Sequence, residues 1–225
     1  MVRRCEEVLR QVQPHVTVLA ATKDRGPEEV RAASLAGINH IGENYVQEAE
    51  RKRALVTEPA VWHMIGHLQK NKAKKAARVF DWVETVDSVE LARRLELALA
   101  VQERVLNVLI QVNIGREPHK AGAHPEDVLT LAQEIRKLPH LVLRGLMAAP
   151  PPGEGPEDSR PHFRAMRRLF EDLRMRLPTP YTRSDTTEFN VLSMGMSADW
   201  EVAVEEGATL IRLGTALFGP LPPAL

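Results

Sequence analysis

The side chain best suited to covalent chemistry is Lys23, which ends the apolar run in "VTVLAATKDRG" (residues 16–26). A primary amine that loses its proton on desolvation can condense with an aldehyde or ketone to form a Schiff base. A lysine at the end of a strand is, however, most often a solvated loop residue. Other parts of the sequence must supply the groups that give Lys23 a chemical role.

Two stretches near the C-terminal end of the chain are suited to binding a phosphate group. "SMGMS" (residues 193–197) joins a β-type run to a helical pattern, and "RLGT" (residues 212–215) closes the last β-type run. Glycine lets the backbone come close to a phosphate, and backbone N–H groups and small hydroxyls bind it. Together with Lys23, these stretches fit two ligands, which are pyridoxal 5′-phosphate (PLP) and a transiently bound sugar phosphate, as in an aldolase.

The elements that would position these residues are β-type runs alternating with helical patterns. Many runs are almost continuous in Val, Ile and Leu, which is typical of parallel strands covered on both faces. The β-type runs are residues 16–22, 40–44, 61–66, 82–86, 107–114, 143–148, 190–195 and 210–214. The helical patterns include residues 26–37, 88–102, 124–138, 161–177 and 197–207.

Eight such units predict an α/β fold, a (β/α)8 TIM barrel formed by one domain over residues 1–225. A doubly wound open sheet is the alternative, but no glycine-rich dinucleotide fingerprint follows the first run. Barrel strands present their C-terminal ends at one face, where ligands bind. The polar or unusual residues at the ends of the runs are Lys23, Glu43, Asn44, His63, Gln111, Asn113 and Met147.

Longer motifs cover nearly the whole chain in order. They are "ATK" at Lys23, "HIGENYVQEAERK", "WHMIGHLQKNKAK", "VETVDS", "VLIQVNIGREPHKAG", "RGLMAAPP", "LSMGMSADWEVAVEEGAT" and "IRLGTALFG". In these motifs the sequence resembles the PLP homeostasis family, also called YggS-like or PROSC-like proteins. The resemblance implies a barrel like the N-terminal domain of alanine racemase.

The resemblance also implies roles for single residues. Lys23 would hold PLP as a Schiff base, Arg212 would face the pyridine nitrogen, and Asn44 would lie near the ring. Ser193, Gly214 and Thr215 would hold the phosphate. The cofactor-binding residues predicted in this way are Lys23, Asn44, Ser193, Met194, Arg212, Gly214 and Thr215.

The predicted function is to bind PLP and to serve its homeostasis by buffering or delivery, without robust turnover. A guanidinium stays protonated, so Arg212 disfavours protonation of the ring nitrogen and makes the ring a poorer electron sink. The alternative is a PLP-dependent amino-acid racemase, which needs an acid or base on each face of the substrate α-carbon. Neither Tyr45 nor Tyr181 is an obvious second group, and the sequence shows no second domain to supply one. No catalytic residue is assigned.

Composition restricts the partners. Lys and Arg number 30, as do Asp and Glu, so the zero formal net charge argues against nucleic acid as the main partner. Cys5 is the only cysteine, which fits a reducing compartment. The N-terminal segment lacks the apolar core of a signal peptide, no run could span a membrane, and no metal-ligand spacing is convincing. We expect a soluble cytoplasmic monomer, with apo forms of PLP enzymes as candidate recipients of the cofactor.

Three surface segments complete the sequence-based predictions. The Pro- and Gly-rich residues 149–161 predict a mobile surface loop, with a lid over the site as the alternative. The basic residues of 69–78 and the cluster of Arg160, Arg164, Arg167 and Arg168 are expected to be solvated. The chain ends in "FGPLPPAL", which departs from the Arg-Asp-Tyr type of tail common in the family and puts any role of that tail in doubt.

Overall fold

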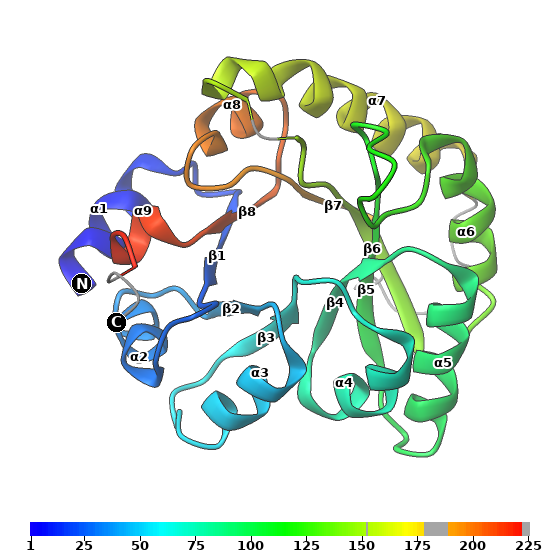
Figure 1. Ribbon diagram of the computed structural model, residues 1–225, viewed down its shortest axis with the longest axis horizontal. Coiled ribbons are helices and arrows are strands. Elements are labelled where there is room, and N and C mark those ends of the chain that lie inside the picture. The colour runs from blue at the N-terminus through cyan, green and yellow to red at the C-terminus, as the bar shows by residue number, and fades with distance from the viewer. Residues whose placement is uncertain (152, 178–188, 222–225) are drawn as a thin grey trace.

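A computed structural model, which describes residues 1–151, 153–177 and 189–221, forms a closed barrel of eight parallel strands in chain order (Figure 1). All eight predicted β-type runs are strands, and the predicted barrel is confirmed. The strands are β1 (Thr17–Ala21), β2 (His40–Glu43), β3 (Val61–Met64), β4 (Trp82–Val86), β5 (Leu106–Gln111), β6 (Leu141–Met147), β7 (Val191–Ser193) and β8 (Leu210–Leu213).

Helices connect the strands and surround the barrel as an outer ring (Figure 1). The α-helices are α1 (Val2–Gln11), α2 (Pro27–Leu35), α3 (Val46–Arg53), α4 (Ala73–Val79), α5 (Val89–Ala100), α6 (Val128–Ile135), α7 (Arg160–Arg176), α8 (Trp200–Glu205) and α9 (Thr215–Phe218). Short 3-10 helices are η1 (Lys70–Lys72), η2 (Pro125–Asp127) and η3 (Pro156–Ser159). After the last strand, α9 follows β8 directly and lies against α1.

Helix starts follow the local sequence signals. Ser88 caps α5 by accepting a hydrogen bond from the Leu91 N–H, and Pro27 occupies the first turn of α2. Ser and Asp side chains are both suited to cap a helix, and Ser197 and Asp199 both precede α8. The structure places Asp199 at the N-cap position, where its Oδ1 accepts from the Met196 N–H at 2.7 Å. Ser197 is thereby left to contact other groups.

The large apolar core lies between the strands and the helices. Trp200 and Phe218 belong to it. The inside of the barrel is different, because ionisable side chains from β2, β3, β4 and β8 lie there in contact with one another. Barrel interiors are more often filled by branched aliphatic residues. This polar interior therefore calls for an explanation beyond packing.

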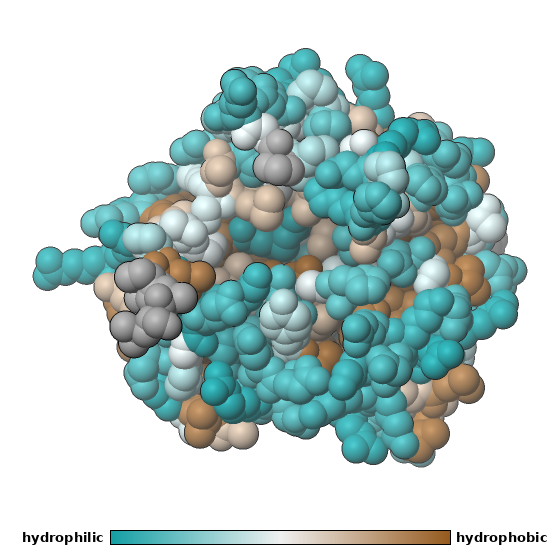
Figure 2. All heavy atoms as spheres, in the orientation of Figure 1, coloured by the Kyte–Doolittle hydropathy of each residue, from teal (hydrophilic) through white to brown (hydrophobic). Residues whose placement is uncertain are grey.

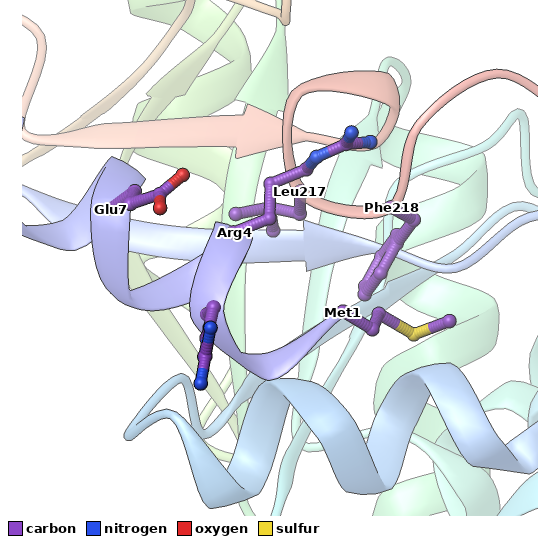
Figure 3. A pocket seen from close by; sticks show the side chains of 6 residues that line it. Met1, Arg4, Glu7, Leu217 and Phe218 are labelled. Atoms are coloured by element: carbon purple, nitrogen blue, oxygen red, sulfur yellow. The ribbon is translucent and has the colours of Figure 1, made fainter.

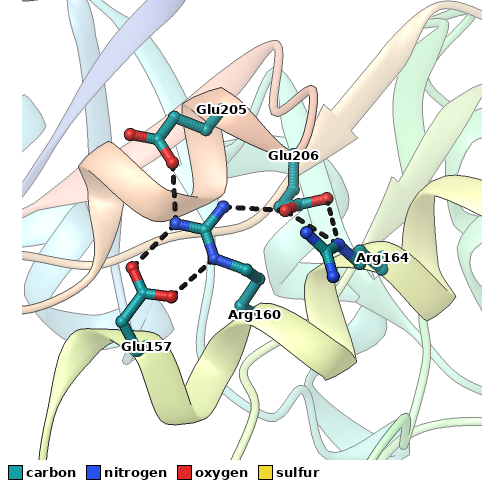
Figure 4. Close-up of polar contacts among 5 residues, drawn as sticks. All are labelled: Glu157, Arg160, Arg164, Glu205 and Glu206. Carbon is teal, nitrogen blue, oxygen red and sulfur yellow. Dashed lines mark hydrogen bonds and ion pairs between the residues drawn. The ribbon is translucent and has the colours of Figure 1, made fainter.

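The segment predicted as a loop over residues 149–161 is partly helical. The 3-10 helix η3 begins at Pro156 and α7 begins at Arg160, so the second half of that segment has regular structure. Arg160 is not freely solvated, because its guanidinium binds the carboxylates of Glu157, Glu205 and Glu206 (Figure 4). Arg164 also binds Glu206. These ion pairs tie the start of α7 to the end of α8.

The basic stretch of residues 69–78 forms ion pairs at the surface. In the basic stretch, Lys70 pairs with Glu90 and Lys75 pairs with Glu50 at the surface, as expected for a solvated helix face.

Within residues 1–151, 153–177 and 189–221, no helix is long and apolar enough to cross a membrane. The same ranges contain no group of three or more His, Cys, Asp or Glu side chains that could hold a metal ion. The end of the tail, residues 222–225, lies outside the described residues.

Candidate functional site

Lys23 lies just beyond the C-terminal end of β1, with its side chain 46% exposed. Its Nζ is 3.7 Å from a carboxylate oxygen of Asp24, which has a positive φ of 57°. Strand β1 pairs with β8, and a Cβ placed on Gly214 would lie 3.3 Å from the Ala21 carbonyl oxygen. Barrel closure thus brings the turn after β8 next to the segment that carries Lys23. In the view of Figure 1, hydrophilic side chains surround a hollow over the centre of the ring (Figure 2).

A buried cluster fixes the backbone immediately before Lys23. The Lys52 ammonium donates to the Thr22 carbonyl oxygen and to Glu43 Oε1, both at 2.6 Å, and the Thr22 hydroxyl donates to the same carboxylate oxygen. The side chains of Lys52 and Glu43 are fully buried. Burial raises the pKa of Glu43, while hydrogen bonds from Lys52 and Thr22 act in the opposite direction. Thr22 is therefore firmly held, and it fixes the position of the backbone from which the Lys23 side chain extends.

The candidate phosphate-binding groups converge around Ser197. Its Oγ accepts hydrogen bonds from the N–H groups of Gly214 and Ala216, both at 3.1 Å. The two stretches "SMGMS" and "RLGT" are thus brought together, as their predicted positions after strands seven and eight required. Thr215, between the two donating amides, is exposed. Small hydroxyls and backbone amides are suited to binding the oxygens of a phosphate group, and here both amides donate to the Ser197 hydroxyl.

Gly195 shapes the connection from β7 to Ser197. Its φ is 95°, a conformation that side-chain-bearing residues rarely adopt. A Cβ on Gly195 would also come within 2.6 Å of the Ala203 Cβ. Its carbonyl oxygen accepts from the Arg212 N–H at 3.0 Å. Glycine is required at this position for both conformation and space.

Arg212 lies inside the barrel and is held by two neutral acceptors. Its Nη1 donates to Ser193 Oγ at 2.6 Å, and its Nη2 donates to the Ala148 carbonyl oxygen at 2.8 Å. Burial lowers the pKa of Arg212, and the negative charges of Glu84 and Asp199 oppose this shift. A guanidinium has five N–H donors, so some remain for a ligand.

Two of the predicted cofactor residues, Ser193 and Met194, have buried side chains. The Ser193 hydroxyl is fully buried and contacts Glu84 and Arg212, whereas Ser197 is the hydroxyl that contacts Gly214. The Met194 side chain lies in the apolar core between strands and helices. A ligand in the barrel mouth could meet Met194 only through its backbone. The roles given to Ser193 and Met194 stay predictions.

A chain of buried hydrogen bonds continues from Ser193 toward the start of β2. Glu84 accepts from Ser193 through Oε2 at 2.6 Å and binds His63 Nδ1 through Oε1 at 2.7 Å. His63 Nε2 is 2.9 Å from His40 Nδ1. The ring of His63 also stacks on Trp82, with centroids 5.1 Å apart. His63 is therefore a histidine of the barrel interior with hydrogen-bond partners at both ring nitrogens.

The protonation states along this chain follow from burial and charge. Burial by itself raises the pKa of Glu84, but the hydrogen bond and charge of His63, the charge of Arg212 and the Ser193 hydroxyl outweigh it, so the pKa is lowered. Burial lowers the pKa of His40 to about 4, assisted by His63 and opposed by Glu84. At neutral pH, Glu84 is an anion and His40 is neutral.

Asn44 follows β2 and is half-buried. Its backbone is held against the turn after β3, because a Cβ on Gly66 would lie 2.4 Å from the Asn44 carbonyl oxygen. The close approach of these two turns fixes the place where Asn44 leaves the barrel wall. The predicted contact between Asn44 and a cofactor ring stays a prediction.

The arrangement offers three kinds of group to one ligand. Lys23 provides an exposed amine, the turn at Ser197 and Gly214 provides a hydroxyl with two amides gathered on it, and Arg212 provides a buried cationic donor on β8. This donor set fits an aldehyde that carries a phosphate and a ring acceptor. Sequence reasoning did not assign roles to Glu84 and Lys52. For Lys52 a signal existed, since it follows Val46 and Ala49 at helical spacing on the inward face of α3.

A groove on the outside of the barrel is separate from this site. It is lined by Met1, Arg3, Arg4 and Glu7 of α1 and its flank, and by Leu217 and Phe218 of α9. Met1 and Phe218 lie close together at one end of it (Figure 3). The seven predicted cofactor residues are not among its lining residues.

Comparison with known proteins gives consistent matches along the chain. A family model described as "Alanine racemase, N-terminal domain" matches residues 1–222. The "Pyridoxal phosphate homeostasis protein" of Haemophilus influenzae is 41% identical over 218 residues, which are 96% of this chain and 89% of that protein. The protein of the same name from Escherichia coli K12 is 38% identical and is matched over 85% of its length by 91% of this chain.

Solved structures agree with the sequence comparisons. PipY from Synechococcus elongatus, without PLP, is 37% identical with a TM-score of 0.88, covering 97% of this chain and 99% of that one. PipY with PLP bound has a TM-score of 0.86 and 36% identity over the same shares. An alanine racemase from Clostridium difficile shares the fold alone, with 12% identity and a TM-score of 0.77 over 98% of this chain and 56% of that one.

Proposed function

Because this chain belongs to the family of pyridoxal phosphate homeostasis proteins, we propose that it binds PLP as a Schiff base on Lys23 and buffers or delivers the cofactor. The observation that carries the proposal is the placement of Lys23. Its exposed amine follows β1, and in the turn after the neighbouring strand β8 the amides of Gly214 and Ala216 gather around the Ser197 hydroxyl. The likeness to PipY with PLP bound supports the choice of cofactor.

Each group has a stated task in this proposal. When the Lys23 amine attacks the aldehyde, a C=N bond forms and one water molecule leaves, which makes the attachment covalent and reversible. The amides and the hydroxyls near Ser197 and Thr215 bind the phosphate, and Asn44 lies beside the ring. Arg212 donates to the ring nitrogen through an N–H that neither Ser193 nor Ala148 takes.

The same arrangement favours storage over turnover. Bound PLP supplies an electron sink for carbanions formed on amino-acid substrates, and the sink is strongest when the ring nitrogen is protonated. Arg212 is a buried cation that holds that nitrogen as an acceptor. Racemisation would need a second acid or base opposite Lys23. Tyr45 is 52% exposed in the turn after β2, and Tyr181 lies outside the described residues.

The experiment is covalent trapping. Purified protein incubated with PLP is reduced with borohydride and its mass is measured, and peptide mapping locates the adduct. We expect one adduct at Lys23 and its loss in Lys23→Ala. Lys70→Ala is the matched control, because Lys70 is a similarly exposed lysine paired with an acid. An adduct of undiminished yield in Lys23→Ala would refute the assignment. D-amino-acid formation well above that of Lys23→Ala would instead support the racemase.

Further parts of the proposal concern the setting in which the protein works. We propose that residues 1–225 act as one PLP-binding barrel domain, as a monomer in the cytoplasm. The partners would be PLP and apo forms of PLP-dependent enzymes. Transfer of the cofactor to an apo-enzyme, faster than release into solution, would support delivery over simple buffering.

A further inference from the structure

We propose that Glu84 is a positioning residue for Arg212, which it orients through Ser193 so that the site prefers a ligand with an unprotonated ring acceptor. The inference rests on the proposed function, because it concerns how the guanidinium meets the PLP ring. Glu84 itself lies too deep in the barrel to be counted among the ligand-contacting groups. It acts on the ligand through two intervening side chains.

The argument begins with the single proton of the Ser193 hydroxyl. A hydroxyl donates one hydrogen bond and accepts two. Ser193 Oγ is 2.6 Å from Glu84 Oε2, and an ionised carboxylate can only accept, so the proton lies on that side. The lone pairs of Oγ are then directed to the other side, where Arg212 Nη1 donates at 2.6 Å. Glu84 thus determines the orientation in which Ser193 holds Arg212.

Glu84 is itself held at both oxygens. Its second oxygen, Oε1, binds His63 Nδ1 at 2.7 Å, and His63 stacks on Trp82. Glu84 and His63 are both fully buried. With both oxygens engaged and both neighbours fixed, the carboxylate has one orientation. The position of Ser193 follows from it.

The charge of Glu84 matters because it balances Arg212 without occupying its donors. A buried guanidinium is costly unless an anion lies nearby. Within the described residues, no carboxylate comes close enough to Arg212 to form an ion pair. Glu84 supplies the negative charge from the opposite side of the Ser193 hydroxyl, which contacts both charged groups. The N–H groups that a direct ion pair would have used stay available for a ring acceptor.

The test compares two ligands that differ at one ring atom. PLP has the ring nitrogen, and its 1-deaza analogue has C–H there but keeps the aldehyde and the phosphate. Dissociation constants for both are measured with wild type, Glu84→Gln and Ser193→Ala. A glutamine at position 84 presents an amide that either donates to Ser193 or forces a change at His63, so the hydroxyl loses its orientation. Glu96→Gln is the matched control, because Glu96 forms a Glu–His pair with His140 near the surface.

We expect wild type and Glu96→Gln to prefer PLP over the deaza analogue by about tenfold or more, as one hydrogen bond from a charged donor would give. In Glu84→Gln and Ser193→Ala, the ratio of the two dissociation constants should fall toward one. Ser193→Thr keeps a hydroxyl at the same place and should restore the preference. If Glu84 had only a structural role, Glu84→Gln would weaken the binding of both ligands equally and leave the ratio of their dissociation constants unchanged.

The outcomes separate this inference from the proposed function. A large wild-type preference that persists in both Glu84→Gln and Ser193→Ala would overturn the inference and leave PLP binding intact. Failure of Lys23 to capture either aldehyde would overturn the proposed function and the inference with it. If Glu84→Gln does not fold, Ser193→Ala decides the question, because it keeps both buried charges and removes only the hydroxyl between them.

Discussion

Ser193 and Arg212 face each other across the neighbouring strands β7 and β8, and the guanidinium donates to the serine oxygen at 2.6 Å. The serine that the sequence places in a phosphate-binding stretch is therefore engaged inside the barrel. Four residues later, Ser197 meets the amides of Gly214 and Ala216. The two serines of "SMGMS" thus have different surroundings, and we expect them to have different functions.

Ser197→Ala should weaken the binding of the phosphate group in particular. The substitution removes the hydroxyl at the point where two amide donors converge. We expect the affinity for PLP relative to pyridoxal, which lacks the phosphate, to fall about three- to tenfold, as for the loss of one hydrogen bond. Binding isotherms for both compounds measure the ratio. Ser34→Ala is the control, since Ser34 lies on α2 away from this turn, and an equal loss for both compounds would contradict the assignment.

Lys52→Met should destabilise the fold by about 3–5 kcal/mol, because it leaves the buried Glu43 carboxylate without its cation. The cost should be smaller at acidic pH. Burial already raises the pKa of Glu43, and loss of the Lys52 hydrogen bond raises it further, so protonation relieves the buried charge. Urea unfolding at several pH values measures the effect. The double variant Lys52→Met with Glu43→Gln should recover most of the loss at neutral pH, and no recovery would argue against a buried ion pair.

Much of the fold could be predicted from sequence because barrel strands carry a strong local signal. Runs such as 107–114 are apolar and short, and only their ends differ from β5 in the structure. The residues at strand ends were placed on one face by the barrel geometry alone. The closeness of Gly214 to Ala21, near Lys23, needs only that the first and last strands pair, which closure of the barrel provides.

The interior of the barrel could not be predicted in the same way. Glu84 lies in the run "WVETV", where alternation shows that its side chain points away from those of Val83 and Thr85 but not that it meets Ser193, 109 residues later. Such contacts depend on the register and tilt of all eight strands. The different fates of Ser193 and Ser197 also escaped prediction, because they depend on the positive φ of Gly195 between them. The local sequence indicates that the chain turns at that glycine, but it does not show the direction in which the chain continues.

Gly195→Ala should destabilise the protein by about 2–5 kcal/mol. The residue has a φ of 95°, and the new methyl group would lie 2.6 Å from the Ala203 Cβ and 3.1 Å from the Trp200 Cα. Backbone strain contributes about 1–2 kcal/mol, and overpacking contributes about 1–3 kcal/mol. Thermal or urea unfolding measures the loss. Gly155→Ala is the control, since nothing lies within 4 Å of a Cβ there, and an equal effect of the two substitutions would contradict this account.

Stability should decrease as the pH falls from about 6.5 to about 4, with His40 as one cause. Burial lowers the pKa of His40 from 6.5 to about 4, so the unfolded chain takes up a proton on His40 at a pH where the folded chain does not. A group with a lowered folded pKa contributes stability above its unfolded pKa and loses it as the pH falls to the folded value. The two values differ by 2.5, which corresponds to at most about 3 kcal/mol, less because His40 is only half-buried.

Urea unfolding in steps between pH 7 and pH 4 measures this dependence, and His40→Gln should make it shallower. The glutamine amide can still bind His63 Nε2, so the contact is kept while the titration is removed. His15→Gln is the control, because His15 is exposed. The lowered pKa of Glu84 adds a further loss only below the ordinary range of a glutamate, so the two effects separate by pH. An unchanged slope in His40→Gln between pH 6.5 and pH 4 would show that the chain of hydrogen bonds does not hold His40 neutral.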